Sequence, residues 1–450
     1  MIFFQFQNIG GLPYTKYILC LILAFSSALS CLAFSGKYPI QNFMPSDYKA
    51  GIQNIDFAQN RNMTLFVANN LGILSYNGKS WERHAFLTGK KQRSLVFDEK
   101  KGRLYFGSQG AFGYFDNDWN LVSLVDKIPP EARDFDEVWD VFLLNDKAYF
   151  CTVQGIYVYD EQRVSVLTHP DGFNRAFKSN GKLFAQSRQG QLLEIKGQEL
   201  MAPHYLSKLN NETIAGIIAH DGGSLIFYNS GKIEFATSFE QARKYEELAE
   251  ILQDKYVNHV LQLSDNRLAI ATQTAGLFLF DLQKQTIENI TTRDGLLSNA
   301  CLRAFQDYSG NMWVGMQNGI TLIDINSPMR FINQKINIQG SGYEAFQREE
   351  GTYYSTSNGI YFQAKNAAQS VFLKGTEGPA YGMQNITGKL YAGHHTGLFL
   401  LSDGTAKRVA YTHGLWQVKQ LQSNPEYAIG GTYSGLFLFR LDAGMTLQGV

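Results

Sequence analysis

The sequence lacks any imbalance of charge, which excludes one large class of partners. Its 450 residues include 40 basic and 40 acidic side chains, so the formal net charge is zero, and charged residues make up only 18%. No basic stripe stands out, and the run Gly89–Arg93 is short and lies between expected strands. A nucleic-acid-binding surface needs concentrated positive charge. We therefore expect these residues to make no direct contact with DNA or RNA.

Cysteine is also scarce, with four residues in the whole chain. Cys20 and Cys31 fall in the N-terminal apolar segment, whereas Cys151 and Cys301 each lie in an apolar run. No C-x-x-C pair and no His–Cys cluster suggests a metal. We expect Cys151 and Cys301 to be buried free thiols, with a disulfide as the alternative in an exported protein. The sequence predicts neither a metal nor a cofactor.

Long apolar stretches are absent except near the N-terminus. There Lys16 precedes a short apolar run, and small residues follow it. This pattern is typical of a secretory signal, with cleavage near Ser30 or Ala33. A lipoprotein signal at Cys31 and an uncleaved anchor are the alternatives. No other stretch reaches the roughly 18 apolar residues that a membrane span needs, so residues 1–33 predict export to the periplasm or the cell envelope.

Ten segments of the remaining chain share one pattern, in which a glycine precedes an apolar, aromatic strand. Aromatic and β-branched residues favour strands, and glycine favours the turns between them. The nine intervals from Gly72 to Gly435 average about 40 residues, a period typical of four-stranded propeller blades. The ten segments are 70–76, 113–116, 154–160, 189–193, 230–235, 275–281, 318–324, 358–362, 396–400 and 434–439.

This repeat predicts a propeller because a blade cannot bury both of its faces alone, whereas blades around an axis shield one another. We predict an all-β protein with a seven-bladed β-propeller of four-stranded blades over residues 34–331. The first blades of a second, incomplete propeller follow over residues 340–450. Three blades cannot close a ring, so we expect the chain to end early relative to its natural architecture; an unusual array of ten repeats is the alternative.

One segment, residues 239–252, breaks the strand rhythm. Tyr245, Leu248 and Leu252 lie on one face of a helix with the usual period. Ser238 has a side chain suited to capping the start of such a helix. We expect a helical insertion between the fifth and sixth blades, as a surface decoration or as a lid or partner contact.

No catalytic arrangement can be argued from spacing alone. The run Asp307–Asn311 has too few oxygen ligands for a calcium loop and is expected to form a turn. Gly107–Gly113 joins two strands rather than a strand and a helix, which excludes a dinucleotide site. His394 and His395 are neighbours on an expected strand, so they should face opposite sides. A pair of carboxylates could be assembled across blades, but the sequence cannot show it.

Candidate ligand-binding residues follow from repeat position. Ligand sites in propellers usually lie at the axis or on the face where the inner strands begin. The candidates at such positions are Trp139, Arg175, His259, Arg303 and, in the second array, Trp416. Tryptophan can stack on sugar rings and arginine can pair with carboxylates. Ordinary packing or a solvated rim is the alternative for each of the five.

The most specific motif lies in residues 293–320. The letters RDGLLSNA, followed by QDYSGNMWVGMQNGI, resemble the two-component-regulator propeller repeat, which reads roughly DGLSNN…V…I.QD..GN.WVGT..GL…D. Met316 replaces the usual threonine. The other nine copies keep mainly the strand–glycine–strand core. The segment Gly51–Trp81 also looks like the opening blade of such proteins, and the resemblance extends over nearly all residues after the signal.

The resemblance implies an extracytoplasmic sensor region of hybrid two-component or helix-turn-helix regulators of the Bacteroidetes type. Such proteins usually carry two seven-bladed propellers, a Tyr-rich β-sandwich, a membrane helix and a cytoplasmic output module. We expect a periplasmic region that senses a small-molecule or oligosaccharide ligand, in a homodimer, with no enzymatic activity of its own. A kinase or DNA-binding module would lie beyond residue 450, and membrane contact would come from an N-terminal anchor or a missing C-terminal segment. A secreted polysaccharide lyase or hydrolase and a passive interaction scaffold are the alternatives.

Overall fold

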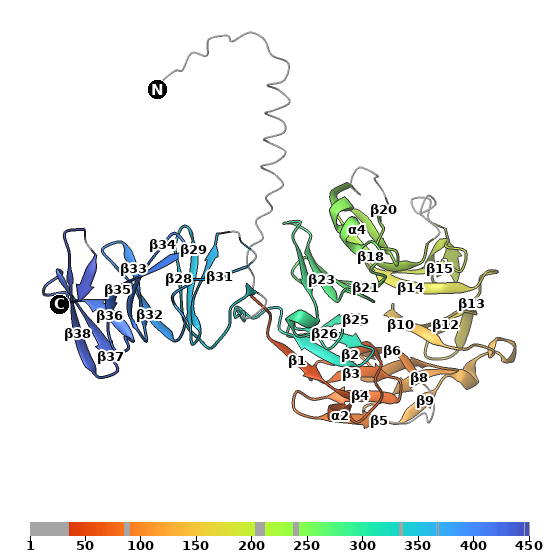
Figure 1. Ribbon diagram of the computed structural model, residues 1–450. Helices are drawn as coiled ribbons and strands as arrows, with labels where there is room; N and C mark the ends of the chain where they lie inside the picture. Colours follow the sequence, from red (N-terminus) through yellow and green to blue (C-terminus); the bar gives the residue numbers. More distant parts are fainter. Residues whose placement is uncertain are drawn as a thin grey trace, which may run out of the picture. The chain divides into compact units, whose positions relative to one another are not determined.

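The protein consists almost entirely of antiparallel sheets, as a computed structural model shows (Figure 1). The structure describes residues 36–84, 91–202, 212–236, 243–332, 336–365, 367, 369–444 and 446–449. The chain divides into two compact units, Tyr38–Met329 and Arg330–Val450, and the second of them also includes residues 36 and 37. The expected export segment, residues 1–33, lies outside the described residues. No helix in the described ranges is long and apolar enough to cross a membrane.

The unit Tyr38–Met329 contains seven sheets that follow one another along the chain, called blades 1 to 7 below. Blade 1 consists of β2 (Asn54–Gln59), β3 (Leu65–Asn69), β4 (Gly72–Tyr76) and β5 (Trp81–His84), and blade 2 of β6 (Gln92–Asp98), β7 (Arg103–Ser108), β8 (Ala111–Phe115) and β9 (Leu121–Ser123). Blade 3 consists of β10 (Val138–Leu144), β11 (Lys147–Thr152), β12 (Ile156–Tyr159) and β13 (Val164–Leu167), and blade 4 of β14 (Phe173–Ser179), β15 (Lys182–Ser187), β16 (Leu192–Lys196) and β17 (Glu199–Met201).

Blade 5 consists of β18 (Ile214–His220), β19 (Gly223–Tyr228) and β20 (Ile233–Phe235), and blade 6 of β21 (Val257–Gln262), β22 (Arg267–Thr272), β23 (Leu277–Asp281) and β24 (Ile287–Ile290). Blade 7 consists of β25 (Cys301–Gln306), β26 (Met312–Met316) and β27 (Gly319–Ile323), joined by β1 (Ile40–Phe43). Short helices lie between them: α2 (Pro45–Tyr48), η1 (Val125–Lys127), η2 (Pro130–Ala132) and η5 (Thr292–Asp294).

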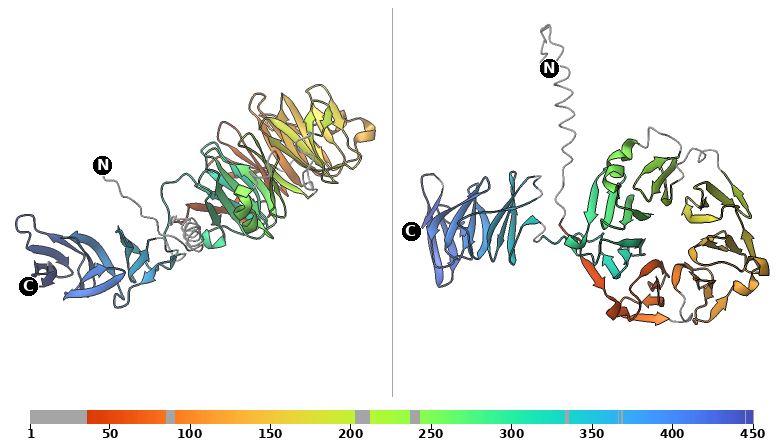
Figure 2. Two further views of the ribbon diagram at one scale, coloured as in Figure 1. Left: turned by 90° about the horizontal axis from the view of Figure 1, so that it is seen from above. Right: turned by 45° about the vertical axis from the view of Figure 1, so that its right-hand side comes forward.

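These seven sheets close into a ring. The first strands of successive blades, β2, β6, β10, β14, β18, β21 and β25, contact one another in that order, and β25 contacts β2. Figure 2 shows the sheets arranged around a central axis. The ring is closed by β1, which pairs with β27 as the outer strand of blade 7, with Ile40 opposite Ile323 and Phe43 opposite Ile320. The all-β propeller class predicted from the repeat is therefore confirmed.

The turn that precedes β26 shows how the sequence builds one blade. Gly310 adopts a φ of +83°, which a residue with a side chain rarely adopts. The Asp307 carboxylate accepts hydrogen bonds from the Asn311 backbone N–H at 2.8 Å and from Trp313 Nε1 at 2.9 Å. Trp313 then stacks on Phe43 of β1, with ring centroids 5.8 Å apart. The run Asp307–Asn311 thus forms the turn expected from its sequence and ties it to the closing strand.

Blade 5 differs from the four-stranded prediction, because it has three strands within the described residues. After β20 the chain forms a 3₁₀ turn, η4 (Arg243–Tyr245), and a helix, α4 (Glu246–Leu252). Tyr245, Leu248 and Leu252 are buried in one cluster with Phe235 of β20 and residues of blade 6. The predicted helical insertion is confirmed over residues 243–252, and its apolar face packs into the core; Ser238 lies outside the described residues.

The second unit contains three four-stranded sheets, called blades 8 to 10. Blade 8 consists of β28 (Gly342–Gln347), β29 (Gly351–Thr356), β30 (Gly359–Ala364) and β31 (Val371–Phe372). Blade 9 consists of β32 (Ala380–Ile386), β33 (Lys389–His394), β34 (Gly397–Ser402) and β35 (Thr405–Tyr411). Blade 10 consists of β36 (Gln417–Gln420), β37 (Tyr427–Thr432), β38 (Gly435–Leu441) and β39 (Leu447–Gly449). The first strands again contact in order, β28 with β32 and β32 with β36. Leu436 and Leu438 of β38 are exposed, whereas Leu277 and Leu279 at the matching positions of blade 6 are buried.

The two cysteines of the described chain lie in different blades of the first unit. Cys151 is in β11 of blade 3 and Cys301 is in β25 of blade 7, and both are buried and free. Burial raises the pKa of the Cys301 thiol to about 12 and also raises that of Cys151. The prediction of two buried free thiols is confirmed, and the disulfide alternative is wrong.

Candidate functional site

A register shift recurs at the start of every inner strand of blades 1 to 7. In each of these strands the pairing with the next strand skips one residue, as between Val138 and Asp140 in β10. The first residues to resume the pairing are Asp56, Ser94, Asp140, Arg175, Gly216, His259 and Arg303. A bulge of this kind bends the strand and redirects a side chain, and bulges are frequent next to functional sites. Seven equivalent positions are thus brought around the axis.

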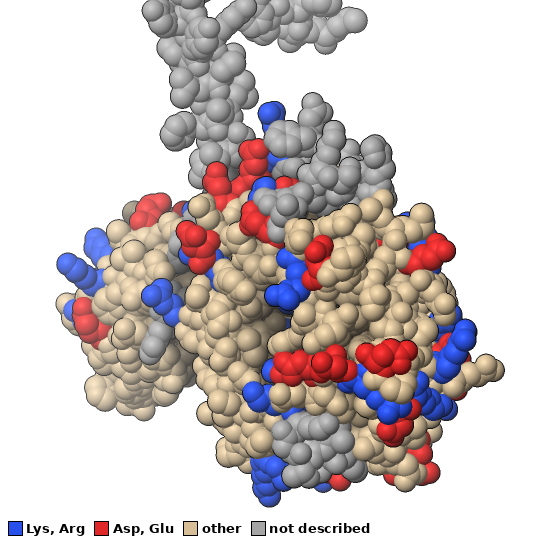
Figure 3. Space-filling view, turned by 90° about the vertical axis from the view of Figure 1, so that its right-hand side faces the viewer, with Lys and Arg blue, Asp and Glu red and all other residues tan. Residues whose placement is uncertain are grey.

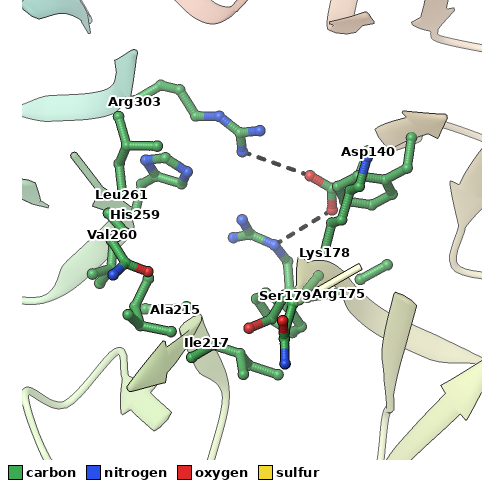
Figure 4. A pocket seen from close by; sticks show the side chains of 18 residues that line it. Asp140, Arg175, Lys178, Ser179, Ala215, Ile217, His259, Val260, Leu261 and Arg303 are labelled. Carbon is green, nitrogen blue, oxygen red and sulfur yellow. Dashed lines mark ion pairs between the residues drawn. The ribbon is translucent and has the colours of Figure 1, made fainter. Parts of the chain in front are cut away.

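Ion pairs connect these positions across the ring. Arg303 Nε lies 3.0 Å from Asp56 Oδ1 in the adjacent blade 1. Arg303 Nη1 lies 3.6 Å from Asp140 Oδ1, and Arg175 Nε lies 3.8 Å from Asp140 Oδ2 (Figure 4). Because blades 7 and 3 are not neighbours in the ring, the pair of Arg303 with Asp140 spans the axis. The Asp56 and Asp140 side chains are nearly buried, with exposed fractions of 8% and 4%.

Hydrogen bonds between neighbouring blades hold the carboxyl side of this network. Asp56 Oδ2 accepts from Ser94 Oγ at 2.7 Å and from the Leu95 N–H at 3.0 Å. Ser94 Oγ in turn accepts from the Val141 N–H at 3.0 Å. The axial side chain of one blade therefore binds the backbone of the next, so blades 1 to 3 are fixed relative to one another at the axis.

His259 lies on the cationic side of the axis. Its Nδ1 accepts a hydrogen bond from the Ala304 N–H at 3.4 Å. Burial lowers the pKa of the His259 imidazole well below its usual value, and the guanidinium groups of Arg303 and Arg175 lower it further. The imidazole is therefore neutral near pH 7, and because Nδ1 accepts, its proton is on Nε2.

An axial cavity of about 300 Å³ opens beside these residues. Inner strands β14, β18 and β21 form most of its wall, and β10 and β25 contribute Asp140 and Arg303. Figure 4 shows the side chains of Arg175, His259 and Arg303 converging on this space. Gly216 stands at the axial position of blade 5, where no side chain fills the cavity; a Cβ atom there would lie 2.8 Å from Val260 Cβ. A volume of this order suits a small ligand.

The structure brings together three of the five residues predicted from repeat position. Arg175, His259 and Arg303 all line the axial cavity. Trp139 does not line it, because the shift in β10 turns Asp140 toward the axis instead. Trp139 is 40% exposed, and its ring centroid lies 4.8 Å from the guanidinium carbon of Arg93.

Trp416 belongs to the other compact unit and lies in an aromatic cluster of its own. Its ring centroid is 4.3 Å from that of Tyr381 and 5.4 Å from that of Tyr433. The hydroxyl groups of Tyr381 and Tyr433 are hydrogen-bonded at 2.6 Å. Trp416 is half exposed, so it is part of an aromatic surface of blades 9 and 10 rather than of the axial cavity.

Sequence reasoning missed the other four of these seven positions, Asp56, Ser94, Asp140 and Gly216. Each occupies the same place in its blade as Arg175, two residues after the strand begins. The signal was therefore present in the repeat, since aligning the blades on Arg175 and Arg303 puts these four residues in the same column. The two carboxylates are both paired with Arg303, which makes them part of an ion network.

The histidine pair of blade 9 departs from its prediction. The rings of His394 and His395 lie 4.3 Å apart between centroids, because β33 ends at His394 and strand alternation does not extend to His395. No group of three or more His, Cys, Asp or Glu side chains suited to a metal occurs within the described ranges. Charge on the molecular surface is mixed as well: Figure 3 shows basic and acidic side chains interspersed over one face.

Comparison with known proteins identifies the fold. No protein-family model matches the sequence, and no curated protein does. The extracellular domain of the putative hybrid two component system BT3049 from B. thetaiotaomicron matches with a TM-score of 0.67 and 16% identity, over 92% of this chain and 60% of that one. The fold is that of this extracellular domain. The present chain therefore spans about 60% of the length of its structural relative.

Two further solved structures match a smaller part of the chain. The WD40 beta propeller domain of Doa1 has a TM-score of 0.50 and 12% identity, over 67% of this chain and all of that one. YCF48 bound to D1 peptide has a TM-score of 0.51 and 14% identity, over 66% of this chain and 99% of that one. The motif in residues 293–320 resembles repeats of two-component regulators, and the BT3049 domain belongs to a putative hybrid two component system; the likeness of the two chains is confirmed for the fold.

Proposed function

We propose that this chain is an exported, ligand-sensing region of a signal-transduction regulator, and that the axial cavity of blades 1 to 7 binds its ligand. The observation that carries the proposal is the convergence of Arg175, His259 and Arg303 on a cavity of about 300 Å³ inside a closed ring. Ligand pockets are typically concave, mostly apolar and provided with a few convergent polar groups. Phe142 and Phe177 supply apolar wall to this cavity.

The sensing role is supported by the fold and the sequence motif together. The BT3049 domain is described as the extracellular domain of a putative hybrid two component system. The secretory pattern of residues 1–33 is consistent with a periplasmic or cell-envelope location. We propose a carbohydrate-like ligand, whose binding shifts a population between two states of a homodimer.

A cavity-filling variant tests the site. The purified chain is titrated with a panel of neutral and acidic mono- and oligosaccharides, and binding is followed by calorimetry and by the rise in unfolding temperature. Leu261→Trp would fill the cavity that Leu261 lines, and Leu71→Trp is the matched control on an exposed position of the same unit. We expect Leu261→Trp to abolish binding and Leu71→Trp to preserve it. Binding that is equal in both variants, or no binding by any member of the panel, would refute the proposal.

A further inference from the structure

The axial cavity carries an excess of positive charge. Arg175, Lys178 and Arg303 line it, whereas Asp140 is the only acidic residue among the described residues of its lining. Asp56 offsets part of the charge of Arg303 from the adjacent blade at 3.0 Å. The remaining positive charge lies in a partly enclosed space, where electrostatic interactions are stronger than in water.

The guanidinium group of Arg175 carries the part of this positive charge that is held by an ion pair but by no hydrogen bond within the described residues. Its Nε is 3.8 Å from Asp140 Oδ2, which is longer than a hydrogen bond. Among the described residues the structure gives the Arg175 side chain no hydrogen bond, although it is only 28% exposed. Arg303, by comparison, holds two carboxylates at 3.0 and 3.6 Å. Arg175 therefore presents a planar set of donors with the geometry that binds a carboxylate through two parallel hydrogen bonds.

His259 adds a second donor on the same wall. Its Nδ1 is occupied by the Ala304 N–H, which leaves the Nε2–H as the donor of the neutral ring. The rest of the lining suits a polyhydroxylated ring, since Ser179, Asn180 and Gln262 offer hydroxyl and amide groups between the apolar side chains. The cavity combines a site for one anionic group with several neutral hydrogen-bonding groups.

We propose that the axial cavity binds a carboxylate-bearing sugar, a hexuronic acid or an oligosaccharide that ends in one, and that Arg175 receives the carboxylate. This inference rests on the proposed ligand-sensing function and specifies the chemical class of the ligand. Asp140 positions the guanidinium group from its Nε side, while Arg303 holds Asp140 from across the axis.

Calorimetric titration of the purified chain with matched pairs of sugars tests the proposal. D-Galacturonate and D-glucuronate are compared with D-galactose and D-glucose, which differ from them only in carrying CH₂OH in place of the carboxylate. Succinate supplies carboxylates without a sugar ring. We expect at least one uronate to bind about 10- to 100-fold more tightly than its neutral partner, as a charged, bidentate contact would give.

Variants at Arg175 assign the effect to the axis. Arg175→Gln is expected to remove the preference for the acid, and Arg175→Lys to restore only part of it, because lysine keeps the charge but not the planar fork. Arg188→Gln, an exposed arginine that follows β15 in the same blade, is the matched control and should bind like the unmodified chain.

The outcomes separate this inference from the proposed function. If neutral sugars bind as tightly as their acids and Leu261→Trp abolishes that binding, the carboxylate inference is wrong and the sensing site stands. If succinate binds in an Arg175-dependent way and no uronate does, the sugar assignment is overturned. If Arg175→Gln binds the uronate unchanged, Arg175 is a structural partner of Asp140 only. Absence of any axial binding refutes both proposals.

Discussion

Replacement of Arg303 by methionine is expected to destabilise the ring of blades 1 to 7. The change keeps most of the side-chain length but leaves Asp56 and Asp140 without the cation that lies 3.0 and 3.6 Å away. Removing one partner of a fully buried ion pair costs about 3–5 kcal/mol, whereas an exposed pair contributes about 0–1 kcal/mol. Arg303 is 22% exposed and Asp140 keeps Arg175 at 3.8 Å, so we expect an intermediate loss of about 2–3 kcal/mol in the free energy of unfolding.

Urea unfolding of the full chain, followed by tryptophan fluorescence, measures this loss. Four of the five tryptophans lie between Tyr38 and Met329, so the signal reports mainly on that unit. Arg163→Met is the matched control, because Arg163 is 73% exposed and 3.8 Å from its carboxylate. We expect the control to lose less than about 0.5 kcal/mol.

A double variant decides whether the unpaired carboxylate of Asp56 causes the loss of stability. Asp56→Asn in the Arg303→Met background removes the carboxylate that has lost its partner but keeps oxygen to accept from Ser94 and Leu95. We expect the double variant to recover about 1 kcal/mol or more relative to Arg303→Met alone. If Arg303→Met is as stable as Arg163→Met, or if Asp56→Asn adds a further loss, the ion pairs of Arg303 do not stabilise the ring.

Three other predictions concern packing and pH. Gly216→Ala should cost about 1–3 kcal/mol, because its Cβ would lie 2.8 Å from Val260 in the inner strand of blade 6. Gly342→Ala, with open space around it, should stay within about 0.5 kcal/mol of the unmodified chain. Because Gly342 lies in the other unit, urea unfolding of both variants is followed by circular dichroism, to which the strands of both units contribute, and equal losses for the two would contradict the packing argument. Phe43→Ala should cost about 3–5 kcal/mol in the same assay, since Phe43 is buried against three aromatic rings of blades 1 and 7; Met44→Ala, at an exposed neighbouring position, should be near neutral. Burial lowers the pKa of His394 to about 4, so the folded state stays neutral while the unfolded chain takes up a proton below about pH 6.5, and stability falls between pH 6.5 and 4. Between pH 6.5 and 4, the free energy of unfolding of His394→Gln should fall by about 2 kcal/mol less than that of the unmodified chain. Parallel curves of stability against pH for the two proteins would show that His394 does not cause the loss.

The blades could be predicted because their signal is local and repeated. The segment 275–281 became β23 (Leu277–Asp281), and 318–324 became β27 (Gly319–Ile323), since apolar residues after a glycine turn fix each strand in place. The pairing of β1 with β27 could not be predicted, because the four residues Ile40–Phe43 carry no information on which distant strand they pair with. The helix α4, which packs on blade 5 beside its three described strands, was placed by its own sequence pattern, but its burial of apolar side chains with β20 could not be read from the repeat.

The site was predicted in part, and the position of each candidate within its inner strand separates the correct choices from Trp139. Repeat position alone brought out Arg175, His259 and Arg303, all of which line the axial cavity. These three residues stand two positions after the start of their inner strands, whereas Trp139 stands one position after the start of β10 and its neighbour Asp140 holds the axial position. The charge balance of the cavity depends on pairs between blades 7, 1 and 3, and such long-range pairs leave no mark on local sequence.

The closing strand β1 also sets the order in which the molecule can mature. Asn42 and Thr321, which bond side chain to side chain at 2.7 Å, are separated by 279 residues. In a polypeptide synthesised from its N-terminus, the backbone of β1 therefore stays unpaired until the hairpin of β26 and β27 has been made. Contacts of such long range slow folding, and an unpaired strand edge invites pairing with other chains. Assembly of this propeller is thus most exposed to error during that interval, before the first strand meets the last sheet.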